Sequence, residues 1–182
     1  MRTNLFYLEK TKRQKDCNDM EKILIVEDDI AFGTMIQTWL RKKGFEVEKT
    51  TSVKAAIQAW EKLESGFDLV LSDLRLPDHD GIFLLQWMRK HGVQVPFIVM
   101  TSYAEIQNVV LAMKSGATDY VAKPFHPDIL LEKIKEAIKN HNTSSQSEKN
   151  IEQREATGNQ ESIDNKKVSG NTESKGNVDV PK

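Results

Sequence analysis

The 182-residue chain lacks most features that mark secreted, membrane-spanning or nucleic-acid-binding proteins. Its single cysteine, Cys17, excludes an internal disulfide and a multi-cysteine zinc site, and it suits a reducing compartment. No apolar run approaches the roughly 20 residues of a membrane span, and residues 1–19 lack the apolar core of a secretory signal. With 26 basic and 27 acidic side chains, the chain has no basic excess for binding nucleic acid by charge. These absences predict a cytoplasmic protein that binds neither membranes nor nucleic acid directly.

Hydrophobic residues are also scarce, at 38% of the chain, and the shortage lies mainly near the C-terminus. Residues 141–182 hold six of them among 42 positions, with no periodicity. Such a segment cannot bury enough apolar surface to offset the entropy lost on ordering. We therefore predict a flexible N-terminal extension over residues 1–19, a folded domain over 20–140, and a disordered polar linker or tail over 141–182.

Within residues 20–140, short apolar runs alternate with amphipathic stretches. The apolar runs predict strands at 23–26, 45–48, 69–72, 96–100 and 119–122. The stretches that follow have apolar residues at helical spacing and predict helices at 30–43, 52–64, 82–90, 104–115 and from 127 onward. Five such strand-then-helix units favour an α/β fold in which helices cover both faces of a parallel sheet.

Polar side chains follow four of these strands. Asp28 and Asp29 come after the first strand, Asp73 after the third, Thr101 after the fourth and Lys123 after the fifth. In an open α/β sheet, ligands bind outside the carboxyl ends of the strands. Clustered carboxylates repel one another unless a cation neutralises them, and their oxygens suit Mg²⁺. Asp73 can then act as a nucleophile toward a phosphoryl group, which Lys123 and Thr101 can bind.

Taken singly, these residues have simpler explanations. Asp28 and Asp29 suit helix N-caps, and Asp73 suits a turn. Lys123 is by default a solvated lysine, and Thr101 is an ordinary strand residue. Their convergence at the ends of several strands favours a common site over several coincidences.

Four segments in order resemble the receiver domain of bacterial two-component response regulators. They are residues 23–29 (ILIVEDD), 73–81 (DLRLPDHDG), 100–102 (MTS) and 116–125 (GATDYVAKPF). The resemblance covers residues 20–140 and implies a flavodoxin-like, doubly wound, five-stranded parallel sheet of (βα)5 type, like that of the chemotaxis regulator, with strand order 2-1-3-4-5. Residues 73–77 and the polar tail are most similar to receivers of enhancer-binding (NtrC-type) transcriptional activators.

The resemblance implies the role of each site residue. Asp73 would accept a phosphoryl group from a sensor histidine kinase, and Lys123 would contact that group. Asp28, Asp29, Asp73 and the backbone carbonyl of Arg75 would bind Mg²⁺. The bond between Lys123 and Pro124 would be cis. The domain would catalyse only its own phosphorylation and dephosphorylation and would transform no external substrate.

The resemblance also implies a switch. Thr101 would move toward the phosphoryl group, and Tyr120 would turn inward behind it. This shift would change the surface of the fourth helix, the fifth strand and the fifth helix, and so promote a homodimer and a transcriptional output. Candidate residues on that surface are Ile106, Val110, Met113 and Tyr120. We expect the output domains of such activators to lie beyond residue 182.

Two other functions remain in view. A Mg²⁺-dependent phosphatase would need a second carboxylate two residues after its nucleophile, where this chain has Arg75. A receiver-like interaction module independent of phosphorylation would not need the acidic and basic site residues. Arg75 and Tyr103 are both large and lie two residues after Asp73 and Thr101. We expect them to screen the phosphoryl group from water and to slow dephosphorylation.

Overall fold

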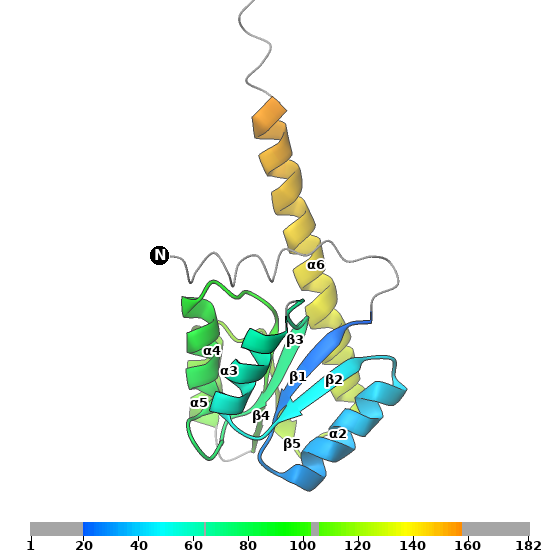
Figure 1. Cartoon of the computed structure of the whole chain (residues 1–182), viewed down its shortest axis with the longest axis vertical. Helices are drawn as coiled ribbons and strands as arrows, with labels where there is room; N and C mark the ends of the chain where they lie inside the picture. Colours follow the sequence, from blue (N-terminus) through cyan, green and yellow to red (C-terminus); the bar gives the residue numbers. More distant parts are fainter. Residues whose placement is uncertain (1–19, 64, 103–105, 158–182) are drawn as a thin grey trace, which may run out of the picture. The chain divides into compact units, whose positions relative to one another are not determined.

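Strands and helices alternate along the chain as the sequence predicts. The computed structural model describes residues 20–63, 65–102 and 106–157. Its elements, labelled as in Figure 1, are β1 (Lys22–Val26), α2 (Ile30–Lys42), β2 (Glu46–Thr50), α3 (Val53–Lys62), β3 (Leu69–Asp73), α4 (Gly81–Lys90), β4 (Phe97–Ser102), α5 (Ile106–Lys114), β5 (Asp119–Lys123) and α6 (Pro127–Thr157).

The five strands form one parallel sheet in the order β2-β1-β3-β4-β5. This order confirms the doubly wound topology that the resemblance implies. The strand order reverses between β1 and β3, which are hydrogen-bonded neighbours. In such sheets, ligands bind at the carboxyl ends of the strands beside this reversal. The topology therefore places the ends of β1 and β3 at the expected ligand site.

Both faces of the sheet are covered. Helices α3, α4 and α5 pack on one face, and α2 and the first part of α6 pack on the other (Figure 1). Alternate residues of the strands enter the two cores, which explains why the three central strands, β1, β3 and β4, consist mainly of uncharged apolar runs. The first core includes Leu24, Val26, Val70 and Val99, and the second includes Ile25, Leu71, Met100 and Val121. Each fully buried aliphatic side chain contributes about 1.5–3 kcal/mol relative to exposure.

Helix α6 extends beyond the end predicted from the sequence. Residues 141–157, expected to be disordered, are helical in the structure. The helix has no proline or glycine after its first residue, so nothing in the sequence stops it before Gly158. Among the side chains that the structure describes in this helix, through residue 144, the last buried one is Ile138, and the helical hydrophobic pattern of the sequence ends there too. The chain divides into two compact units, residues 1–145 and 146–182, and the described part of the second unit is helical.

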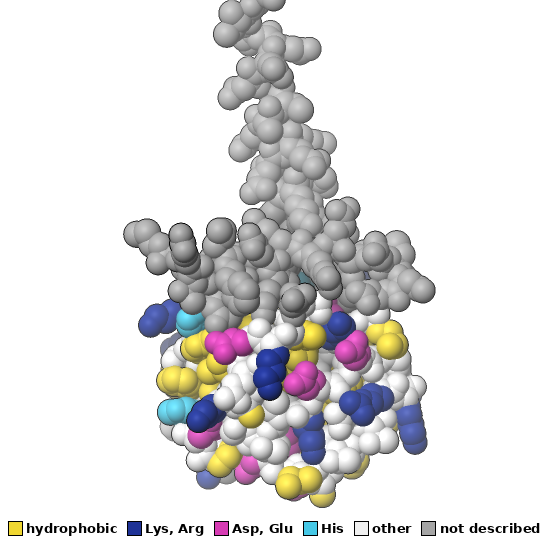
Figure 2. Space-filling model, in the orientation of Figure 1, with side chains coloured by type: hydrophobic (Ala, Val, Ile, Leu, Met, Phe, Trp, Pro, Cys, Tyr) yellow, Lys and Arg dark blue, Asp and Glu magenta, His cyan; other side chains and the backbone are white. Residues whose placement is uncertain are grey.

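The surface of the described residues is mixed in charge. Basic and acidic side chains are interspersed on the face shown in Figure 2. None of the helices in the described residues is both long and apolar enough to cross a membrane. Large exposed hydrophobic side chains include Val110, Leu111 and Met113 of α5 and Tyr120 of β5. The side chain of Ile106 lies outside the described part of the structure.

Gly81, the first residue of α4, passes directly over the backbone of β3. Its N–H donates to the carbonyl of Leu74 at 2.8 Å. A Cβ atom added there would lie 2.2 Å from the carbonyl oxygen of Asp73, far inside van der Waals contact. The start of α4 and the end of β3 can therefore approach each other only because this residue has no side chain.

We expect Gly81→Ala to destabilise the domain by about 1–3 kcal/mol or more, since backbone atoms must move apart to admit the methyl group. Gly33→Ala in α2 is the matched control. Its new Cβ would meet the Cδ atom of Lys49 at 2.9 Å, and that half-buried but flexible side chain can move aside. Urea unfolding followed by circular dichroism measures both variants. Equal stability of the two variants would contradict the proposed backbone clash.

Candidate functional site: an acidic pocket closed by Lys123

Three charged residues meet at the carboxyl ends of three strands. Glu27 follows β1, Asp73 ends β3 and Lys123 ends β5. Side chains alternate between the two faces of a strand, so residues two apart share a face. The residues two positions before these three all lie in the core under α2 and α6: Ile25, Leu71 and Val121. The alternation therefore brings the three charged groups to the same side of the sheet edge.

The ammonium of Lys123 bridges the two carboxylates. Its Nζ lies 2.6 Å from Oε2 of Glu27 and 2.6 Å from Oδ2 of Asp73. The side chains are only 2%, 15% and 22% exposed for Glu27, Asp73 and Lys123. The ammonium also lies 4.5 Å from the ring centre of Phe32, a favourable cation–π distance. Lys123 is therefore held in place by groups from three separate segments.

Burial and charge shift the proton affinities within this group. Burial raises the pKa of Glu27, and the repulsion of Asp73 adds to the rise, while the hydrogen bond and charge of Lys123 partly offset it. Burial alone would lower the pKa of Lys123, but the hydrogen bonds and charges of Asp73 and Glu27 raise it above its ordinary value. Lys123 therefore stays protonated at neutral pH as a fixed positive charge beside Asp73.

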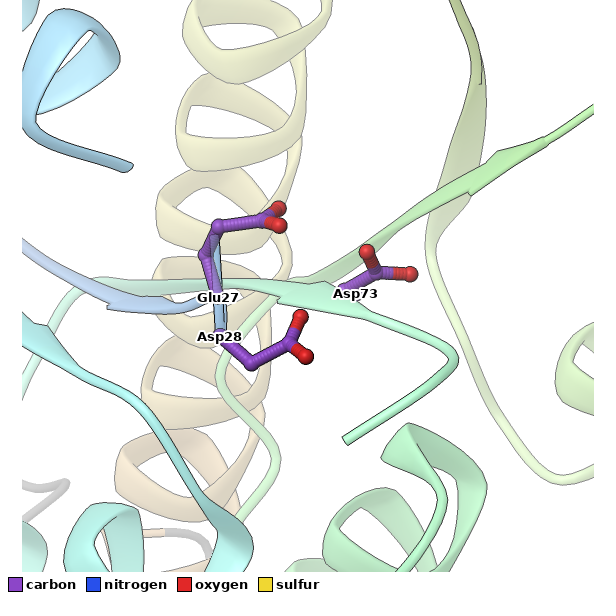
Figure 3. Close-up of side chains that lie close together, drawn as sticks. All are labelled: Glu27, Asp28 and Asp73. Carbon is purple, nitrogen blue, oxygen red and sulfur yellow. The ribbon is translucent and has the colours of Figure 1, made fainter. Parts of the chain in front are cut away.

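A third carboxylate, Asp28, completes an acidic cluster. Glu27, Asp28 and Asp73 each offer an oxygen within 4.8 Å of the others. Figure 3 shows the side chains of Glu27 and Asp28 extending from the end of β1 toward Asp73. Three hard oxygen donors against one ammonium leave negative charge that a divalent cation can neutralise. The donor set therefore fits Mg²⁺, and Asp28 and Asp73 are the expected ligands that the structure brings together.

Asp29 is placed differently from the prediction. Its carboxylate accepts the N–H groups of Ala31 at 2.9 Å and Phe32 at 3.0 Å, and so caps the start of α2. The acidic pair of the pocket is therefore Glu27 with Asp28, and the structure corrects the expected pair of Asp28 with Asp29. The alternation of β1 contains the signal for Glu27, because this residue is in phase with buried Ile25.

Thr101 and Tyr120 lie on neighbouring strands. Thr101 is 2% exposed, and its hydroxyl donates to the carbonyl of Ser102 at 3.2 Å. In the parallel pairing of β4 with β5, Thr101 faces Ala122, two residues beyond Tyr120, so both side chains lie on one face. The ring of Tyr120 is 44% exposed and lies 5.8 Å from the Nζ of Lys133. Tyr120 is thus turned toward solvent, with Thr101 buried on the same side of the sheet.

Two further expectations concern residues beside the site. The peptide bond between Lys123 and Pro124 is cis, as the resemblance implies. The backbone N–H of Arg75 donates to Oδ1 of Asp73 at 3.2 Å, which ties the loop after β3 to the carboxylate. Tyr103 lies outside the described residues. The effect of Arg75 and Tyr103 on phosphoryl lifetime stays a prediction.

The geometry defines a class: a doubly wound α/β domain with an acidic pocket and a lysine at the carboxyl edge of its sheet. Residues 23–135 match the family described as "response regulator receiver domain", and the chain belongs to this family. Its function class is therefore that of a receiver domain of two-component response regulators.

Two relatives show which kind of response regulator this chain is similar to. The chain is 39% identical over 111 residues to the regulatory protein AtoC of Escherichia coli, covering 61% of this chain and 24% of AtoC. It is also 39% identical over 117 residues to the transcriptional regulatory protein ZraR of Klebsiella oxytoca, covering 64% of this chain and 26% of ZraR. Both relatives are NtrC-type regulators, so the predicted likeness to receivers of this type is confirmed. The chain spans about a quarter of the length of these relatives.

Solved receiver structures agree with the fold. A CheY-like response regulator receiver domain from Methanospirillum hungatei JF-1 superposes with a TM-score of 0.65 at 34% identity. The match covers 69% of this chain and 99% of that domain. The matched part of the chain therefore corresponds to nearly the whole of a solved receiver domain.

The raised pKa of Glu27 predicts a pH dependence of stability. A carboxyl group with a higher pKa in the folded state binds its proton more tightly there, so the folded state loses stability as pH rises between the two pKa values. We expect wild type to lose stability relative to Glu27→Gln as pH rises above about 4.5, the ordinary glutamate value. Urea unfolding of both proteins in EDTA, from acidic to neutral pH, measures the difference. A difference that does not vary with pH, or that changes in the opposite direction, would contradict this electrostatic assignment.

Proposed function

We propose that this receiver accepts a phosphoryl group from a sensor histidine kinase on Asp73. One observation carries the proposal: Asp73 stands at the carboxyl edge of β3 with its two oxygens on different partners. Oδ2 contacts the ammonium of Lys123 at 2.6 Å, and Oδ1 accepts the N–H of Arg75 at 3.2 Å. The carboxylate is thus oriented, partly exposed and next to a fixed positive charge.

In the proposed transfer, an oxygen of Asp73 forms the new bond to phosphorus. The bond between phosphorus and the histidine nitrogen of the kinase breaks, and that nitrogen leaves with the electron pair. The ammonium of Lys123, already beside Asp73, pairs with a phosphoryl oxygen as negative charge moves onto this edge. The buried hydroxyl of Thr101 supplies a further hydrogen-bond donor once it reorients.

Mg²⁺ belongs to the proposal as the cation of the acidic pocket. Asp28, Asp73 and the backbone carbonyl of Arg75 would hold it, with Glu27 beside them in place of the expected Asp29. When bound, Mg²⁺ neutralises the carboxylates and the incoming phosphoryl group. Glu27 remains paired with Lys123 in this arrangement, and so keeps the lysine oriented toward Asp73.

The switch is proposed to act through Thr101 and Tyr120. Movement of Thr101 toward the phosphoryl group would open space behind it on the same face of the sheet, and the ring of Tyr120 would turn into that space. Val110, Met113 and Tyr120 are exposed on α5 and β5. We propose that this surface, with α6, forms a homodimer on phosphorylation. We also propose that it controls a transcriptional output, as the name of the transcriptional regulatory protein ZraR suggests.

We expect a small-molecule phosphodonor with Mg²⁺ to add one phosphoryl group to wild type and none to Asp73→Asn. The substitution keeps the size of the side chain but removes its nucleophilic charge. Intact-protein mass spectrometry measures the addition, with Asp80→Asn as the control. Asp80 lies in the same loop and caps α4 through its contact with Phe83, a role that Asn can fill.

Labelling of Asp73→Asn at the wild-type level would place the acceptor elsewhere and refute the proposal. Absence of labelling in the folded wild type would favour an interaction module that works without phosphorylation. Steady release of inorganic phosphate from external phosphate esters would favour a phosphatase.

A further inference from the structure

An acidic residue in the loop after the phosphoacceptor contacts a helix far away in sequence. Asp78 lies between β3 and α4, and its carboxylate accepts two N–H groups from the start of α3. Oδ1 accepts from Val53 at 3.0 Å, and Oδ2 accepts from Lys54 at 2.8 Å. Oδ1 also accepts the N–H of His79 at 3.0 Å within the loop itself. The carboxylate thus joins the tip of the loop to α3.

Asp78 and Ser52 together accept the first backbone N–H groups of α3. The hydroxyl of Ser52 accepts the N–H of Ala55 at 3.2 Å, and Asp78 accepts the two N–H groups before it. Helix starts leave their first N–H groups without intrahelical partners, and a carboxylate there also benefits from the helix dipole. Burial by itself would raise the pKa of Asp78, but these hydrogen bonds lower it below its ordinary value. The carboxylate is therefore ionised at neutral pH and caps α3 from outside the helix.

The base of the same loop is tied to the phosphoacceptor. The N–H of Arg75 donates to Oδ1 of Asp73, and Arg75 pairs with Asp80 in a short antiparallel bridge. Gly81 then donates to the carbonyl of Leu74 at 2.8 Å. The loop therefore closes on itself at its base, and Asp78 anchors its tip.

Through α3, the contact of Asp78 also connects the loop to the backbone of Glu27, on the opposite side of the acidic pocket. Helix α3 follows β2 after a short connection, and the last residue of β2, Thr50, accepts the N–H of Glu27 at 3.0 Å. The loop of Asp78 and the backbone of Glu27 are thus held by the same segment. The backbone of Glu27 and the loop after Asp73, which lie on either side of the acidic pocket, therefore both depend on the position of residues 50–54.

We propose that Asp78 is a positioning residue for the phosphorylation site, because its contact with α3 fixes the loop that carries the backbone carbonyl of Arg75. Asp78 touches neither the phosphoryl group nor the cation in this account. Without its anchor, the tip of the loop can move, and the Arg75 carbonyl loses its fixed place at the pocket. This inference rests on the proposed function, in which that carbonyl is a ligand of Mg²⁺.

The test compares Asp78→Ala with Ser52→Ala in the full chain. Both variants remove acceptors from the start of α3, so both lose stability in urea unfolding, but only Asp78→Ala frees the loop. We expect Asp78→Ala to raise the half-saturating Mg²⁺ concentration in calorimetric titration about tenfold, the effect typical of lost support around a metal site. Ser52→Ala keeps the wild-type value. Asp78→Asn, which retains one acceptor oxygen, falls between Asp78→Ala and wild type.

Labelling by a phosphodonor gives a second measurement. At low Mg²⁺, Asp78→Ala is labelled more slowly than wild type, and saturating Mg²⁺ restores most of the rate. Should Asp78→Ala fail to fold, Asp78→Asn carries the same comparison.

Equal Mg²⁺ affinity in Asp78→Ala and Ser52→Ala would overturn the inference and leave Asp78 as a helix cap alone. A wild type that binds Mg²⁺ but takes no phosphoryl group on Asp73 would overturn the proposed function. The titrations would still decide whether Asp78 supports the cation site, so the two failures are distinguishable.

Discussion

The ammonium of Lys123 is the contact on which the pocket depends. It lies 2.6 Å from carboxylate oxygens of both Glu27 and Asp73, and so joins the ends of β1, β3 and β5. Without it, two partly desolvated carboxylates would face each other beside a third, Asp28, and repulsion would spread them apart. The positive charge that holds the resting pocket together is also the charge that would bind a phosphoryl group in the proposed transfer. Lys123 therefore stabilises the resting pocket and, in the proposed reaction, also binds the phosphoryl group.

This contact requires the rest of the fold. Strand alternation sets Glu27, Asp73 and Lys123 on one side of the sheet, and the strand order sets β3 next to β1. The close approach of Gly81 to the carbonyl of Asp73 holds α4 against the end of β3. Asp78 then connects the loop between them to α3. Each constraint narrows the positions open to the Asp73 carboxylate.

The sequence predicts the architecture well, because hydrophobic runs report directly on buried strands and helix faces. It also places Asp28, Asp73, Thr101 and Lys123 at the ends of the correct strands. It could not sort the aspartates, because an aspartate after a strand serves equally well as a pocket carboxylate or as a helix cap. Asp29 is a cap, and the pocket takes Glu27 instead.

Two other structural features cannot be predicted from the local pattern of hydrophobic residues. The role of Asp78 is hidden because its partners, Val53 and Lys54, lie 25 and 24 residues earlier in the chain. The continuation of α6 to Thr157 is missed because residues 141–157 contain few hydrophobic residues and show no hydrophobic period. In both cases the information lies in backbone hydrogen bonds rather than in apolar spacing.

Glu27, and not Asp29, lies in the pocket with Asp73 and Lys123. The decisive measurement is the rate at which a phosphodonor labels Asp73 in Glu27→Gln and in Asp29→Asn at one Mg²⁺ concentration. Asn preserves the helix cap at position 29, so Asp29→Asn should be labelled at the wild-type rate, whereas Glu27→Gln should be labelled about tenfold more slowly, as expected when support of a cation site is lost. The opposite order, with Asp29→Asn slow and Glu27→Gln unaffected, would contradict this account of the site.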